Sequence, residues 1–249
     1  MIQSVDRAIT ILCMFNNQTQ ELGITEMSQY MKLPKSTVHG LVKTLEAREF
    51  LEQNPENEKY RLGFKVYELG LAYSAAVELE SAARAAAYDL SARFEESVHL
   101  AVYAGGMAVF VLRKDPKMSI IAFPRVGASI PAHATAVGKV LLAYLPEAEV
   151  VKFLAADLYS ITQNTINDPG ILRAELKLIR NRGYGIDNEE AVGGLACVAA
   201  PIRDRSSLVI AAISLSGPAA KILGDGHEEI IKEVVQSSAK ISRALGYIG

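Results

Sequence analysis

The chain has 249 residues, of which 50% are hydrophobic and 22% are charged, with a mean hydropathy of +0.16. This composition supports a packed core and excludes disorder as the main state. The formal net charge of −2 excludes a basic coat over the whole surface, although it leaves room for local basic patches.

Neither a membrane segment nor a secretory signal is predicted. No run of about 18 apolar residues occurs, and the first ten residues lack a basic segment followed by an apolar block. The two cysteines, Cys13 and Cys197, lie too far apart for a disulfide framework or a zinc site. We therefore expect a cytoplasmic protein that needs no metal or other cofactor.

The first 62 residues predict three helices and a small hairpin. Apolar residues at helical spacing favour a first helix capped by Ser4 and a second that begins at Thr25. Pro34 suits the first turn of a third helix, which we expect to run to about Phe50. Extended runs at 50–53 and 59–62 then flank a turn rich in Asn, Pro and Glu. This order is the outline of a winged helix-turn-helix.

The rest of the chain predicts an α+β domain. Residues 74–96 have high helix propensity and lead into it. A Gly105-Gly106 turn predicts a hairpin. Asp168 and Gly183 are suited to begin and end a helix. We expect strands at 98–103, 109–113, 119–125, 184–189, 197–202 and 208–214, with helices at 133–145 and 168–182 and at the C-terminus. Hairpins with helices on one side favour an antiparallel sheet of the GAF or profilin kind over a doubly wound sheet.

Local charge identifies a candidate DNA-binding surface. Residues 1–75 carry eight Lys or Arg and nine Asp or Glu, yet 32–43 and 59–65 each contain three basic residues and no acid. Two basic segments, one on the third helix and one on the hairpin, suit contacts with DNA phosphates. The candidates that lie off the apolar stripe are Lys35, Ser36, Thr37, His39 and Lys43 on the helix, with Lys59 and Arg61 on the wing. The alternatives are a solvated helix face and basic residues that protect a strand edge.

A candidate anion site lies further along the chain. The helix near His133 begins with small residues, so its free amide groups are open to a carboxylate. Tight packing of this helix on the sheet would explain the small residues equally well. Ser214 and Ser216 share one face of a strand, where two hydroxyls among apolar residues need partners.

Several longer segments resemble a known family. SVDRAITIL, ITEMSQYMKLPKSTVHGLVKTLEAREFL and YRLGFKVYELG resemble the N-terminal domain of the IclR family of bacterial transcription regulators. IPAHATAVGKVLLAYL, NTINDPGILRAELKLIRNRGYGIDNEE and CVAAPI are similar to its ligand-sensing domain, in the same order. The resemblance implies a winged helix-turn-helix at 1–63, a linker helix at 64–80 and an effector-binding and oligomerisation domain at 81–249.

The resemblance also implies partners and a ligand site. It implies a homodimer or homotetramer that binds palindromic operator DNA, and a repressor of a carbon-catabolic operon that senses a keto, sugar or aromatic acid. Repression and activation both stay open on the residues alone. The positions that match the family's effector site are the amides of Ala136 and Val137, the polar residues Asp187, Cys197, Ser214 and Ser216, and the apolar residues Ala122, Ile130 and Leu195.

Two other classes of function compete with this interpretation. An enzyme acting on small acids would use Cys197 as nucleophile with His99, His133 or His227 as base, but no diagnostic spacing supports it. A metal site built on His133 and Cys197 likewise has no spacing signature. A sensor that acts through protein contacts alone would not need the two basic segments.

Overall fold

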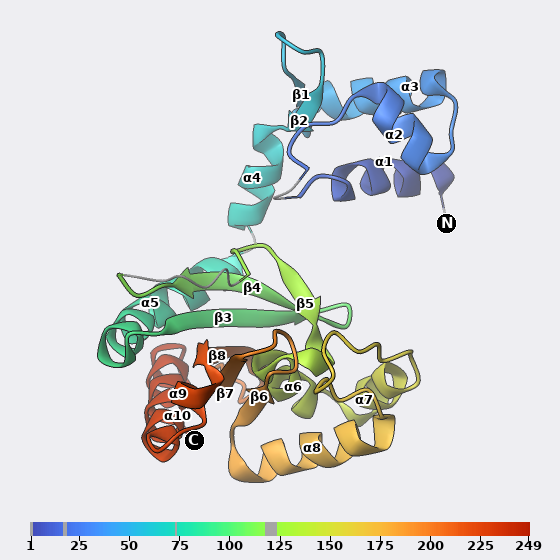
Figure 1. Cartoon of the computed structure of the whole chain (residues 1–249). Helices are drawn as coiled ribbons and strands as arrows, with labels where there is room; N and C mark the ends of the chain where they lie inside the picture. Colours follow the sequence, from blue (N-terminus) through green and yellow to red (C-terminus); the bar gives the residue numbers. More distant parts are fainter. Residues whose placement is uncertain (1, 17–18, 73, 118–123) are drawn as a thin grey trace. The chain divides into compact units, whose positions relative to one another are not determined.

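The computed structural model describes residues 2–16, 19–72, 74–117 and 124–249 (Figure 1). The chain divides into two compact units, Met1–Val77 and Glu78–Gly249. The division falls within 64–80, the segment expected to form one linker helix. That segment contains α4 (Phe64–Ala72) and the first residues of α5 (Ser74–Phe94).

The first unit is the expected winged helix-turn-helix. It contains α1 (Gln3–Cys13), α2 (Ile24–Met31) and α3 (Lys35–Glu46), followed by the antiparallel hairpin β1 (Leu51–Gln53) and β2 (Tyr60–Leu62). Leu22 extends the hairpin through paired backbone hydrogen bonds with Tyr60, both 2.9 Å. The apolar face of each helix turns inward, and the core contains Ile11, Phe15, Met27, Val38, Val42, Leu45, Leu51 and Tyr60.

The helix ends in this unit correct three expectations. Ser4 does not cap α1, because the helix already begins at Gln3, with Ile2 at the N-cap position and no side-chain cap. Thr25 does not open α2 either, since the backbone N–H of Gly23 donates to the Glu26 carboxylate at 2.6 Å and the helix begins at Ile24. The third helix ends at Glu46 rather than Phe50, because the backbone turns through a left-handed conformation at Glu49.

The second unit is built on a six-stranded antiparallel sheet with the order β5-β4-β3-β8-β7-β6. The predicted Gly105-Gly106 turn joins β3 and β4, and both glycines have positive φ. Asp168 caps its helix by accepting the N–H of Ile171, and Gly183 ends that helix in a left-handed conformation, as predicted. The strands are β3 (Ser97–Ala104), β4 (Met107–Lys114), β5 (Ser129–Pro131), β6 (Gly185–Asn188), β7 (Leu195–Arg203) and β8 (Val209–Pro218).

Helices cover both faces of this sheet, so the expectation of helices on one side was wrong. One face packs against α5, α9 (Ala219–Ile222) and α10 (His227–Ala244), and the other packs against α6 (Ala136–Ala143), α7 (Glu147–Leu154) and α8 (Pro169–Arg182) (Figure 1). Successive residues of a strand point to opposite faces, and in β7 and β8 apolar residues occupy both sets of positions. Each face therefore needs a helical cover.

Two further expectations changed. The predicted helix over 133–145 is interrupted, because Ala132–Ala134 form a 3-10 turn and Thr135 adopts an extended backbone before α6 begins. The strand expected at 119–125 falls mostly outside the described residues, and Pro124 and Arg125 are not in a strand. Within the described part of the chain, no helix has the length and apolar character to cross a membrane.

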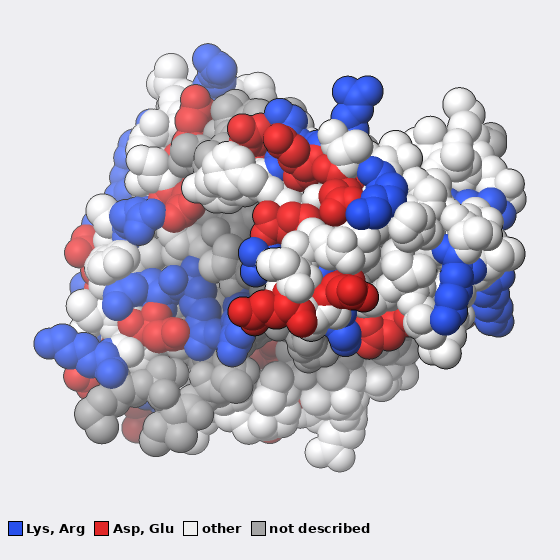
Figure 2. Space-filling model, turned by 90° about the horizontal axis from the view of Figure 1, so that it is seen from above, with Lys and Arg blue, Asp and Glu red and all other residues white. Residues whose placement is uncertain are grey.

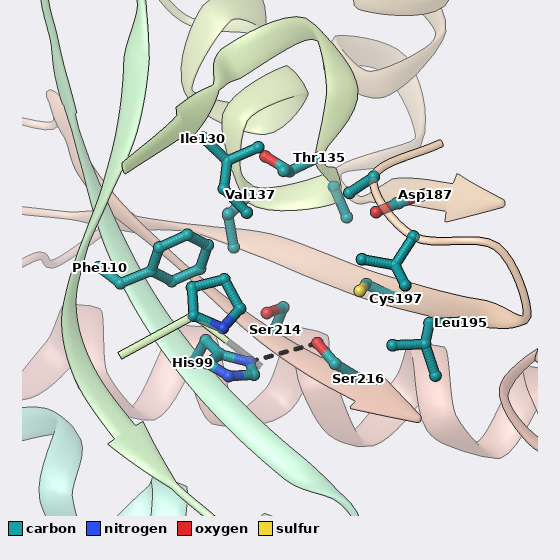
Figure 3. A pocket seen from close by; sticks show the side chains of 14 residues that line it. His99, Phe110, Ile130, Thr135, Val137, Asp187, Leu195, Cys197, Ser214 and Ser216 are labelled. Atoms are coloured by element: carbon teal, nitrogen blue, oxygen red, sulfur yellow. Dashed lines mark hydrogen bonds between the residues drawn. The ribbon is translucent and has the colours of Figure 1, made fainter. Parts of the chain in front are cut away.

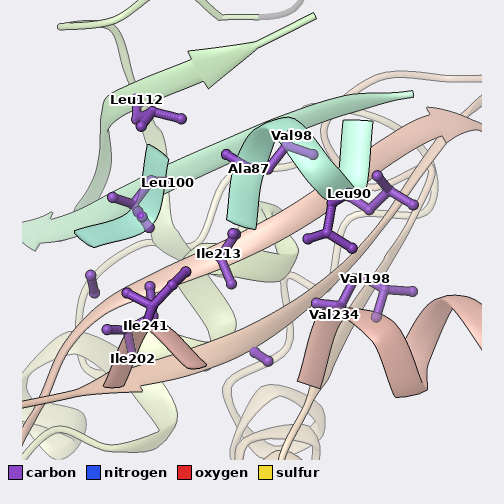
Figure 4. Close-up of a cluster of buried hydrophobic side chains, with 14 of the residues drawn as sticks. Ala87, Leu90, Val98, Leu100, Leu112, Val198, Ile202, Ile213, Val234 and Ile241 are labelled. Carbon is purple, nitrogen blue, oxygen red and sulfur yellow. The ribbon is translucent and has the colours of Figure 1, made fainter. Parts of the chain in front are cut away.

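The core between the sheet and α5, α9 and α10 yields a stability prediction. Ile213 in β8 is fully buried beside Leu100, Val198 and Val234 (Figure 4). We expect Ile213→Ala to lower the free energy of unfolding by about 2–5 kcal/mol, because it removes buried methyl groups and leaves a cavity. Urea denaturation would measure this loss. The control Leu208→Ala, at a side chain that is 64% exposed, should change stability by at most about 0.5 kcal/mol.

Candidate functional site

A cavity lies on the second face of the sheet, beneath the N-terminus of α6 (Figure 3). Its empty space, including the open solvent at its mouth, is about 430 Å³. Every residue of the expected effector site lines it except Ala122, which lies outside the described residues. The lining consists of His99, Phe110, Pro124, Ile130, Thr135, Ala136, Val137, Asp187, Ala191, Val192, Leu195, Cys197, Ser214 and Ser216.

Polar side chains cross the floor of this cavity in a row. Asp187 in β6 is directly opposite Cys197 in β7, which in turn is opposite Ser216 in β8. The row continues to His99 in β3, whose Nδ1 lies 3.3 Å from Ser216 Oγ (Figure 3). With strands about 4.8 Å apart, the four positions span roughly 14 Å. The register of the sheet thus brings together residues that are up to 117 positions apart.

Ser214 lies beside this row and opposite His99. Its side chain is buried, and no hydrogen bond of its hydroxyl is found within the described residues. A buried hydroxyl without a protein partner is expected to bond to water or a ligand. This hydroxyl is therefore available to a molecule in the cavity.

The N-terminus of α6 forms the roof. Thr135 caps the helix by accepting the N–H of Gly138 at 3.0 Å, which leaves the amides of Ala136 and Val137 without hydrogen bonds in the described structure. A Cβ on Gly138 would lie 2.2 Å from the carbonyl oxygen of Ala132, so only glycine fits there. Both interpretations of the small residues therefore hold: they allow tight packing, and the amides at this helix end stay open.

Burial shifts three ionisable groups of the cavity toward their uncharged forms. Burial raises the pKa of Asp187 to about 7, and burial together with Arg113 lowers the pKa of His99 to about 4. Burial also raises the pKa of the Cys197 thiol well above its usual value. A protonated thiol is a poor nucleophile, which disfavours the enzyme built on Cys197. Among the described lining residues there is no Lys or Arg.

A buried ion pair supports one end of the cavity. Lys139 in α6 contacts the carboxylate of Glu190, and both side chains are almost fully buried. The backbone N–H of Glu190 donates to Asp187 Oδ1 at 2.7 Å, and its carbonyl accepts the Thr165 hydroxyl, also at 2.7 Å. The pair thus joins α6, the β6–β7 loop and the segment before α8. Neither Lys139 nor Glu190 was singled out from the sequence.

The expected DNA-binding residues lie on α3 and the wing of the first unit. Lys35, Ser36, His39 and Lys43 are exposed and Thr37 is half-buried, while Val38, Val42 and Leu45 face the core. Lys35 has no ion-pair partner in the described part of the chain, whereas Lys43 is 2.7 Å from Glu46.

Both wing cations are paired with carboxylates. Lys59 lies 3.2 Å from Glu26, and Arg61 contacts Glu52. Lys, Arg, Asp and Glu are also interspersed on the face seen in Figure 2 rather than separated by sign. The candidate cations of the two segments therefore differ, because Lys43, Lys59 and Arg61 each have a carboxylate partner and Lys35 has none in the described part of the chain.

His99, Phe110 and Thr135 are lining residues that the effector-site prediction missed. Thr135 precedes a small apolar run, which is the pattern of a helix N-cap and could have identified it. His99 is a polar residue in an otherwise apolar strand, a signal of an inward-facing functional group. Phe110 has no such signal, because its edge-on contact with His99 depends on the pairing of β3 with β4.

Comparison with known proteins identifies the class to which this fold and cavity belong. A family model described as the IclR helix-turn-helix domain matches residues 4–55, and one described as the bacterial transcriptional regulator IclR C-terminal domain matches 71–243. The chain belongs to the IclR family of bacterial transcriptional regulators, and it is not an enzyme.

The chain is similar to individual members along most of its length. It is 40% identical to the HTH-type transcriptional regulator XynR of Escherichia coli K12, over 99% of this chain and 98% of that protein. It is 34% identical to the HTH-type transcriptional repressor AllR of Salmonella typhimurium, over 98% and 90%. A crystal structure of an IclR homologue from Microbacterium hydrocarbonoxydans in complex with 4-hydroxybenzoate superposes with a TM-score of 0.87, at 26% identity, over 97% of this chain and 98% of that one.

The Lys139–Glu190 pair yields a second stability prediction. Lys139→Met leaves the Glu190 carboxylate buried without its cation, so we expect a loss of about 3–5 kcal/mol in the free energy of unfolding. The double variant Lys139→Met/Glu190→Leu removes both charges and should recover most of that loss. Urea denaturation of the three proteins would measure the difference. Equal losses in the single and double variants would contradict a role for the ion pair itself.

Proposed function

We propose that this regulator binds a palindromic operator as a dimer, through α3 and the wing of each subunit, and represses a carbon-catabolic operon until a small organic acid binds. The observation that carries the ligand part is the cavity, where the open amides of α6 face a buried polar floor. The chain's membership of a family of transcriptional regulators supports the DNA part.

The exposed face of α3 supports its role as the recognition helix. Lys35, Ser36 and Thr37 form its first turn, where the amides of Lys35 and Ser36 and the positive helix end favour phosphate. His39 and Lys43 continue the same exposed face and can donate to base edges or to phosphates. On the wing, Lys59 and Arg61 contribute less, because DNA must compete with Glu26 and Glu52 for them.

Exposed apolar side chains support the dimer. Val5 and Ile9 on α1 are 52% and 54% exposed, and Phe64 and Tyr67 on α4 are 65% and 59% exposed. Apolar side chains at this spacing form stripes on the two helices, and such stripes suit a second copy of the same surface. Two copies supply the two recognition helices that an inverted repeat requires.

The chemistry of the cavity supports a carboxylic acid as effector. Two free amides at a helix N-terminus favour an anion, and Ser214 offers a further donor. The apolar residues Phe110, Ile130 and Leu195 suit the carbon skeleton of a small molecule. An acid that binds one arrangement of the two units more tightly than another shifts DNA affinity by that difference.

Anisotropy with a labelled fragment of the protein's own promoter would test both parts. We expect binding at low ionic strength, and weaker binding when one of three acids is added: pyruvate, gluconate or 4-hydroxybenzoate. Failure to bind the fragment with or without acids would overturn the DNA-binding role. DNA binding that no acid changes, together with unchanged melting temperature, would overturn the ligand role.

Lys35→Ala should weaken DNA binding regardless of base sequence. Loss of a phosphate contact should reduce the slope of log K against log salt by about one for each Lys35 that contacts DNA. Anisotropy titrations over a range of salt concentrations would measure that slope. Lys59→Ala is the matched control, with a smaller change because Lys59 is already paired with Glu26. A larger change in slope for Lys59→Ala than for Lys35→Ala would place the main phosphate contact on the wing.

Ser214→Ala should weaken binding of the active acid by about tenfold or more, because the hydroxyl donates to a charged group. Its DNA affinity without acid should match that of the unsubstituted protein, since Ser214 belongs to the second unit. Calorimetry with whichever of the three acids releases DNA would measure the first effect. Ser81→Ala, at an exposed position of α5, is the control. An unchanged acid affinity would remove Ser214 from the site.

A further inference from the structure

We infer that the effector carboxylate binds together with one proton, which Asp187 holds as a neutral carboxylic acid that donates a hydrogen bond to the ligand. The inference rests on the proposed acid-binding function and adds to it the protonation state of Asp187. It makes the regulator's response to its acid dependent on pH.

The packing of β6 against α6 places Asp187 near the expected position of the ligand carboxylate. A Cβ on Gly185 would lie 2.8 Å from the Val140 side chain and 3.1 Å from the Ala136 carbonyl oxygen, so β6 approaches the first turn of α6 closely. Asp187 is two residues further along β6 and therefore on the same face of the strand. Asp187, Ala136 and Val137 all line the one cavity.

The surroundings of Asp187 provide no cation to compensate a second negative charge. From α6 it faces Lys139, whose ammonium group already contacts the Glu190 carboxylate. From the β6–β7 loop it faces Glu190, and from β7 it faces the protonated Cys197 thiol. His99, further along the row, is neutral near pH 7. The charged groups around Asp187 thus largely cancel one another before any ligand arrives.

A second carboxylate in this cavity would therefore share a largely buried site with Asp187. Two carboxylates that share one site do not both stay ionised, and one of them takes up a proton. In the free protein Asp187 is already partly protonated at neutral pH, because burial raises its pKa to about 7. The ligand carboxylate, held by the amides of Ala136 and Val137, keeps its charge, and Asp187 takes one proton from solvent.

The sign of the pH dependence follows from this uptake. Below neutrality Asp187 already carries the proton, and the acid binds without further cost. Above neutrality the proton must be acquired on binding, so the Kd rises with pH and approaches a tenfold increase per pH unit. Between about pH 6.5 and pH 8.5 the expected increase is about 25-fold for a group with a pKa of about 7 in the free protein.

Calorimetry of the full-length protein over this pH range tests the inference. The probe is whichever of pyruvate, gluconate or 4-hydroxybenzoate binds most tightly at pH 6.5, and titrations in phosphate and Tris buffers count the protons taken up. We expect uptake approaching one proton near pH 8. Asp187→Asn keeps a neutral donor at this position, so its Kd should change less than about threefold across the range.

Two control variants distinguish titration of Asp187 from other effects. Asp225→Asn removes an exposed carboxylate from the turn between α9 and α10 and should keep the full pH dependence. Ser214→Ala should weaken binding at every pH without flattening the profile, because Ser214 does not titrate. Circular dichroism at both ends of the range confirms that each variant is folded.

The outcomes separate this inference from the function on which it rests. If an acid binds with the same Kd at pH 6.5 and 8.5, or if Asp187→Asn keeps the pH dependence, the proton-coupled step is wrong and the acid-sensing function stands. If none of the three acids binds at pH 6.5, the acid-sensing function fails, and this inference fails with it.

Discussion

The close packing of α6 against the sheet is the constraint on which the cavity depends. Gly138 lets the 3-10 turn at Ala132–Ala134 fold back on the helix, and Gly185 lets β6 approach its first turn. A side chain at either position would separate these backbones. The helix N-terminus would then no longer lie above the polar floor, and its free amides would face neither Ser214 nor Asp187.

This packing also explains why charged groups can be buried beside the cavity. Lys139 is carried into the interior by a helix whose other residues are apolar, and it is neutralised there by Glu190 from the β6–β7 loop. Since the same loop supplies Ala191 and Val192 to the cavity wall, the ion pair fixes the wall relative to the helix. Residues held in place in this way lose less conformational entropy when a partner binds to them.

The two proposed sites both attract a negatively charged partner, but they differ in the charged residues that they offer to it. In the second unit the proposed anion site has no lysine or arginine in its described lining, so neutral donors and a helix end would have to replace formal charge. In the first unit, three of the four cations proposed to contact DNA, Lys43, Lys59 and Arg61, have carboxylate partners. There the free Lys35 at the start of α3 gains importance, because its charge is not already compensated.

The sequence by itself determined the kinds of elements and most of their order. Periodic apolar residues predicted the three helices, the Gly105-Gly106 turn predicted the hairpin, and Asp168 and Gly183 marked the ends of α8. Such signals are local, because a cap or a turn depends on a few neighbouring residues. The resemblance to a family also named the residues Ile130, Ala136, Val137, Asp187, Leu195, Cys197, Ser214 and Ser216, which line one cavity.

Only the tertiary structure decided how these residues lie relative to one another. The register of β6, β7 and β8 aligned Asp187, Cys197 and Ser216, and the pairing of β8 with β3 placed His99 opposite Ser214 and within 3.3 Å of Ser216 Oγ. Packing from both sides of the sheet buried Lys139 with Glu190 and raised the pKa of Asp187. Pairing of this kind joins residues far apart in the chain, and burial depends on everything packed around a group. Neither the strand pairing nor the burial of a group is determined by the spacing of residues along a single segment.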